Sequence, residues 1–116
     1  MSSKEIDNII INTPFDKGVI RMDIQQVYSQ ITDIAKQNQV KKVMLFGSRA
    51  RGDHREKSDI DLAIYGCQNF ADFSDQLEEE LWSLLELDLI NMDSDYVSKE
   101  LIHEIEKDGV TLYEKV

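Results

Sequence analysis

The spacing of apolar residues along the chain switches repeatedly between a helical period and a period of two. Helices are predicted at 23–39, 48–51, 70–85 and 98–107, and strands at 41–46, 59–65, 87–92 and 110–113. Because helices and strands alternate, we expect an α/β (α+β) domain in which the helices pack against one small sheet.

Both long helices are predicted from an apolar face with polar residues opposite. In the first helix this face consists of Ile24, Val27, Tyr28, Ile31, Ile34 and Ala35, and Asp23 is suited to cap its start. In the helix predicted at 70–85 the apolar face consists of Phe70, Phe73, Leu77, Leu81, Leu84 and Leu85. Glu78 to Glu80 lie near the opposite side, as expected for a helix that covers a core and faces water.

The strand predicted at 59–65 places two carboxylates on one face. Apolar and acidic residues alternate strictly here, so Asp59 and Asp61 lie opposite Ile60 and Leu62. Residues two apart on a strand are roughly 6.5–7 Å apart, which suits two carboxylates that bind a metal ion or a pair of ions. A helix capping box beginning at Ser58 is the alternative, and we reject it because the period of two continues to Gly66.

Two further features are each open to two interpretations. Gly47-Ser48 follows a buried strand, where it could let a phosphate approach the backbone or simply make a turn with Ser48 as a helix cap. Asp88 interrupts the apolar run 87–90, so it must be paired, protonated or metal-bound if the strand is buried. On an edge strand Asp88 would instead face water.

Chain length and composition limit the kinds of protein this can be. The 116 residues suffice for one domain, which we place at 21–116 after an N-terminal arm (1–20) that we leave unassigned. No apolar stretch is long enough to cross a membrane, and the start lacks the pattern of a secretory signal, so we expect a cytoplasmic protein. The single cysteine, Cys67, is expected to be a small, semi-buried apolar residue.

The charge is large and unevenly distributed. A net charge of −10 argues against a broad nucleic-acid surface, because Lys and Arg supply most of the affinity for phosphates. Six of the 13 basic residues lie within 41–57, whereas 72–108 contains thirteen acidic residues and two lysines. This distribution suggests a local anion site on an otherwise repelling molecule.

Taken together, these motifs resemble a known superfamily. The chain resembles the polymerase-β-like nucleotidyltransferases in their signature: Gly47-Ser48 is followed by ten residues and then by Asp59-Ile60-Asp61. The segment GSRARGDHREKSDIDLAIYG is similar to the minimal nucleotidyltransferases, the MNT group, and the resemblance extends from the first helix to the closing 105–113. It implies a nucleotidyltransferase fold with a small mixed sheet flanked by helices.

The resemblance also implies roles for individual residues. Gly47 and Ser48 would hold the triphosphate of ATP, and Asp59, Asp61 and Asp88 would be catalytic and bind two Mg²⁺ ions. Arg49 or Arg51 is available for the β and γ phosphates, although a salt bridge to Glu56 or Asp53 explains either arginine nearly as well.

Members of the MNT group are commonly antitoxins of HEPN-type ribonuclease toxins. The resemblance therefore implies that AMP is transferred from ATP to a tyrosine hydroxyl of such a toxin, within a hetero-oligomer and without direct contact to nucleic acid. The alternative is a non-catalytic antitoxin that covers the toxin with its acidic helices at 78–80 and 104–106. Transfer to a small molecule is less favoured, because 116 residues leave no room for an acceptor domain.

Overall fold

The computed structural model describes residues 23–55, 57–81, 83 and 85–116. The N-terminal arm expected at 1–20 and Glu56, a possible partner of the arginines, lie outside the described residues. In the described part the elements follow the predicted order: α1 (Ile24–Gln37), β1 (Lys42–Phe46), α2 (Ser48–Arg51), β2 (Ile60–Tyr65), α3 (Phe70–Glu80), β3 (Leu87–Asn91), α4 (Lys99–Asp108) and β4 (Val110–Glu114).

The four strands form one mixed sheet in the order β3-β2-β1-β4. β1 pairs antiparallel with both β2 and β4, whereas β2 pairs parallel with β3. The mixed sheet expected from the family resemblance is therefore confirmed. The pairing places Phe46 opposite Asp61, and Asp61 opposite Asp88.

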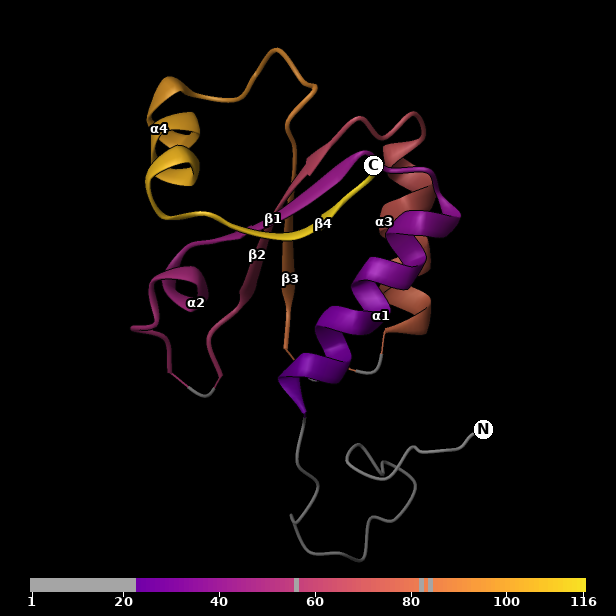
Figure 1. Cartoon of the computed structure of the whole chain (residues 1–116), viewed down its shortest axis with the longest axis horizontal. Coiled ribbons are helices and arrows are strands. Elements are labelled where there is room, and N and C mark those ends of the chain that lie inside the picture. The colour runs from indigo at the N-terminus through magenta and orange to yellow at the C-terminus, as the bar shows by residue number, and fades with distance from the viewer. Residues whose placement is uncertain (1–22, 56, 82, 84) are drawn as a thin grey trace, which may run out of the picture.

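The two faces of the sheet carry separate apolar clusters. Figure 1 shows α1 and α3 together on one side of the sheet and α4 on the other. Ile60, Leu62 and Ile64 of β2 are fully buried in the larger cluster, together with residues of α1 and α3. Ala63 of β2 belongs to the smaller cluster, which includes Ile105 of α4. Because side chains alternate along a strand, Asp61 lies on the α4 face.

Local side-chain bonds explain where the helices begin. The side chain of Asp23 accepts a hydrogen bond from the backbone N–H of Gln25 (3.0 Å), which confirms the predicted cap of α1. Ser98 caps α4 in the same way and accepts from the backbone N–H of Leu101 (3.1 Å). No helix in the described ranges is long and apolar enough to span a membrane.

Helix α3 ends earlier than predicted. It stops at Glu80, not at residue 85, and the backbone of Leu81 is already extended. Glu78 to Glu80 form the last turn with no basic residue beside them, so negative charge accumulates at the negative end of the helix dipole. Past the end, the Ser83 hydroxyl accepts from the backbone N–H of Leu85 (2.9 Å), a local bond that competes with helix formation.

Candidate nucleotide and metal site

The turn after β1 brings Gly47 directly against Asp61. The backbone of Gly47 has φ +76° and ψ −157°, a conformation that residues with a side chain rarely adopt. A Cβ atom added at Gly47 would collide with a carboxylate oxygen of Asp61. The two halves of the motif, twelve positions apart between Gly47 and Asp59, are thus in contact in space.

Three carboxylates gather at the ends of β2 and β3. Asp61 and Asp88 are register partners on the parallel pair, and Asp59 lies two residues before Asp61. Asp61 is half-buried, while Asp59 and Asp88 are exposed. Because β3 is the outermost strand, Asp88 faces water, as in the edge-strand alternative, and it needs no buried partner. The structure nevertheless places Asp88 beside Asp61, as the metal-site hypothesis requires.

Negative charge at this point is only partly compensated. Burial is the largest cause of a raised pKa of Asp61, and Asp88, Asp59 and Glu104 raise this pKa further. Arg51 acts in the opposite direction and lowers it. The carboxylate of Asp61 therefore lies where a cation would be favourable.

The two arginines of the motif have different surroundings. Arg49 donates from Nε to the backbone carbonyl of Ser58 (3.0 Å). Burial raises the pKa of Tyr28, and the charge of Arg49 and its hydrogen bond with Tyr28 partly offset this rise. Arg49 thereby ties α2 to the residue just before Asp59.

Arg51 is held by two acidic side chains. Its Nε donates to Asp53 (3.2 Å), and its Nη1 lies 3.5 Å from a carboxylate oxygen of Glu104. The salt bridge to Asp53 that we weighed from the sequence is therefore present. These contacts use two of the five N–H donors of the guanidinium, which leaves donors for a phosphate.

Glu104 belongs to the site, although it was not among the site residues predicted from the sequence. It belongs to α4, far along the chain from the motif, and the sequence suggested only an acidic helix face at 104–106. Glu104 is four residues from both Glu100 and Asp108, so these three side chains lie on one face of α4. Nothing in that pattern indicates that Arg51 lies beside Glu104. The two histidines of the chain, His54 and His103, are both exposed.

The donor set fits a hard cation, although it does not enclose one. Carboxylate oxygens are the ligands that Mg²⁺ prefers, and a bound ion would offset the charge that raises the pKa of Asp61. Among the described residues, no three Asp, Glu, His or Cys side chains are close enough to surround a metal ion. Mg²⁺ commonly binds one or two carboxylates and completes its shell with water and substrate phosphates. Asp61 with one of its two neighbours, Asp59 or Asp88, matches that mode.

Comparisons with known proteins agree with this geometry. Residues 29–116 match the family described as "Polymerase beta, Nucleotidyltransferase". "Putative protein adenylyltransferase MJ1379" of Methanocaldococcus jannaschii is 35% identical over 83 residues, which cover 70% of this chain and 80% of that protein. "Putative protein adenylyltransferase MJ0604" of the same organism is 58% identical over 31 residues, which cover 27% of this chain and 31% of that protein.

Solved structures share the fold. A chain of a toxin–antitoxin crystal structure with AMP-PNP has a TM-score of 0.59 at 24% identity, with 76% of this chain and 73% of that chain covered. A chain of a mutant MntA-HpeT toxin–antitoxin complex has a TM-score of 0.58 at 23% identity, with the same coverage. The family match over three quarters of the chain and the Gly47–Asp61 contact lead to one conclusion: the chain belongs to the polymerase beta nucleotidyltransferase family.

Proposed function

We propose that this nucleotidyltransferase is a Mg²⁺-dependent protein adenylyltransferase that transfers AMP from ATP to a tyrosine hydroxyl of a HEPN-type ribonuclease toxin, and so acts as its antitoxin. The observation that carries the proposal is the contact between Gly47 and the Asp61 carboxylate, with Asp88 in register beside it. This contact puts a turn suited to a triphosphate next to the carboxylates suited to its metal ions.

Each residue has a distinct part in the proposed reaction. Gly47 and Ser48 hold the triphosphate, and Arg51 binds its β and γ phosphates with its remaining donors. Arg49 keeps the turn and Asp59 at a fixed separation. Asp59, Asp61 and Asp88 would hold two Mg²⁺ ions, which when bound neutralise charge on the phosphates.

The transfer forms one bond and breaks one. The tyrosine oxygen attacks the α-phosphorus of ATP, the bond to the β-phosphate oxygen breaks, and pyrophosphate leaves. Asp88 is exposed on the edge strand, so it is accessible to an incoming hydroxyl and can accept its proton. The reaction needs ATP and a partner protein, in keeping with the cytoplasmic location we expected.

The relatives support this choice of reaction and partner. The match to MJ1379 covers 80% of that relative, and its name is "Putative protein adenylyltransferase". The structural neighbours come from toxin–antitoxin complexes, one of them with an ATP analogue.

The test measures transfer of labelled AMP to a purified HEPN-type toxin. We expect Asp59→Asn and Asp61→Asn to abolish labelling from ATP labelled at the α-phosphate. Asp95→Asn is the matched control, because Asp95 is an exposed carboxylate in the loop after β3. Unchanged labelling by both motif variants, with circular dichroism showing an intact fold, would reject the proposal.

A second candidate is neutralisation by binding alone, and the charge distribution favours it. Residues 72–108 contain thirteen acidic residues and two lysines, and the acidic helix α3 within this segment suits contact with a basic nuclease groove. The combined substitution of Asp59, Asp61 and Asp88 by Asn separates the two functions. Full rescue of toxin-inhibited growth by this variant would establish binding as the mechanism.

A further inference from the structure

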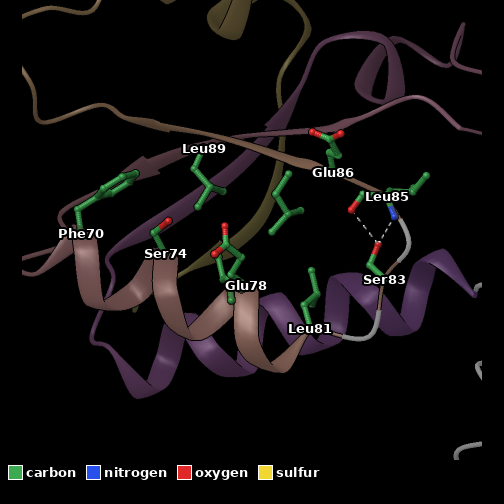
Figure 2. Close-up of a pocket in the computed structure, with 10 residues that line it drawn as sticks. Phe70, Ser74, Glu78, Leu81, Ser83, Leu85, Glu86 and Leu89 are labelled. Atoms are coloured by element: carbon green, nitrogen blue, oxygen red, sulfur yellow. Dashed lines mark hydrogen bonds between the residues drawn. The ribbon is translucent and has the colours of Figure 1, made fainter. Parts of the chain in front are cut away.

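A groove lies between α3 and the edge strand β3. It has a volume of about 400 Å³, and its floor is made mainly by leucine side chains of both elements and of the connection between them. Figure 2 shows Phe70, Leu81 and Leu89 directed into this groove, with Leu85 at one end of it. Several of these side chains also pack on the main core while remaining only partly buried.

The groove and the carboxylates are on opposite faces of the sheet. Leu87 and Leu89 line the groove, and Asp88 lies between them in the strand. Because successive side chains of a strand point to opposite faces, Asp88 is directed away from the groove. The groove is therefore separate from the nucleotide and metal site.

The walls of the groove belong to the most acidic part of the chain. Glu78 of α3 and Glu86, the residue just before β3, border it, and in Figure 2 the carboxylate of Glu86 points away from α3. Residues 69–98 contain nine acidic residues and no Lys, Arg or His, so the whole α3–β3 unit is negative. An apolar floor with acidic walls is complementary to an apolar stripe flanked by basic side chains.

We propose that this groove binds a basic amphipathic helix of the partner protein. Such a helix would place an apolar stripe on Phe70, Leu81 and Leu89, which are only partly buried, and direct Lys or Arg to Glu78. It would also continue the layer that α1 and α3 form on this face of the sheet (Figure 1). This inference rests on the proposed function, since it states how the toxin is held.

The acidic helices at 78–80 and 104–106 therefore cannot form one continuous surface. Glu78 lines the groove on one face, whereas Glu104 contacts Arg51 beside the carboxylates on the other. The α3 face holds the partner, and the opposite face carries out the transfer. A tyrosine of the same partner molecule would have to reach around the sheet edge, so a second partner molecule is the simpler acceptor.

The test uses the full chain and two synthetic helical peptides. One peptide has leucines at every third or fourth position with lysines on either side, and the other has glutamates in place of the lysines. Fluorescence anisotropy gives the affinity of each peptide, and amide chemical shifts locate the bound peptide. We expect the lysine peptide to bind, and the perturbed amides to cluster at Phe70, Ser74, Leu77 and Leu89.

Matched variants connect binding to the groove. Ser74→Arg puts a bulky cation into the groove and should weaken binding of the lysine peptide by at least about ten-fold. Ser29→Arg, on an exposed position of α1, should leave the affinity unchanged. Glu78→Lys changes only an exposed wall residue and should weaken binding even if Ser74→Arg proves unstable.

Three results would overturn the inference: equal binding of the glutamate peptide, equal weakening by Ser74→Arg and Ser29→Arg, or perturbed amides clustered at Asp61 and Glu104. ATP affinity of the same variants is measured in parallel and should stay unchanged. If ATP fails to bind any variant while the lysine peptide binds the groove, the proposed activity fails and the docking surface stands.

Discussion

At the scale of single residues, the Asp61 carboxylate occupies the space that a side chain at position 47 would need. Gly47→Ala should therefore lower the free energy of unfolding by about 1–3 kcal/mol, because its backbone is in a region almost restricted to glycine. It should also abolish AMP transfer, since Asp61 must move. Thermal unfolding and labelling measure the two effects.

Gly52→Ala is the control for Gly47→Ala. Gly52 also has a positive φ (+87°), but a Cβ atom there would meet nothing within 4 Å. It should therefore cost about 1–2 kcal/mol of stability from backbone strain while transfer persists. Equal loss of transfer in both variants would show that strain, and not the contact with Asp61, matters.

The residue scale also shows what the sequence could and could not predict of the site. Asp59 and Asp61 were predicted to share a face because alternation along a strand is a local property. The partners of Arg49 and Arg51 depend on how distant segments meet, and no local pattern contains that information. For this reason the contacts of Arg51 with Glu104 and of Arg49 with Ser58 were not predicted, and phosphate binding by either arginine stays a prediction.

At the scale of elements, α4 orients a side chain of α2. Glu104→Gln removes one of the two carboxylates that orient Arg51, so its guanidinium becomes less well placed for the β and γ phosphates. We expect the Kd of ATP to rise about two- to five-fold, in line with an exposed ion pair of less than about 1 kcal/mol. The Kd of AMP, which lacks these phosphates, should not change.

Glu106→Gln controls for the loss of a charge from the same helix, since Glu106 is exposed on α4. Isothermal titration with ATP and AMP gives both affinities for each variant. Tighter binding of ATP by Glu104→Gln would contradict the positioning role, because it would mean that Glu104 competes with the phosphates for Arg51.

The element boundaries were predictable where local chemistry decides them. The caps at Asp23 and Ser98 are short-range and were recognisable from the sequence. The end of α3 was predicted wrongly because the apolar period continues through Leu81 and Leu85, while the accumulated glutamates end the helix at Glu80. Here charge at a helix end outweighed periodicity.

At the scale of the whole molecule, the acidic site around Asp61 lowers the stability of the fold. Burial and the neighbouring Asp88 and Asp59 raise the pKa of Asp61, so its ionised form is disfavoured in the folded state. The folded protein then holds this proton more tightly than the unfolded chain. The free energy of unfolding therefore falls as the pH rises from the unfolded pKa of Asp through the raised folded one.

Asp61→Asn should accordingly raise the melting temperature by a few degrees at pH 7 without Mg²⁺. The difference from the natural protein should shrink when the pH is lowered below the unfolded pKa of Asp, where both side chains are neutral. Added Mg²⁺ should stabilise the natural protein and not the variant, because a ligand of the folded state is lost. Calorimetry at two pH values, with and without Mg²⁺, tests this, and a less stable variant at pH 7 would refute it.

The Arg49–Ser58 hydrogen bond has a consequence for how this motif can vary in length. Because Arg49 closes the loop at its base, the turn at Gly47 and the carboxylate at Asp59 keep their separation independently of the chain path between them. Extra residues placed just after Gly52 would enlarge a surface loop at small entropic cost and leave the two halves of the motif in place. The length of the ten-residue interval is thus set by the connecting loop and not by the geometry of the site. The loop offers an insertion point for a tag or a reporter peptide.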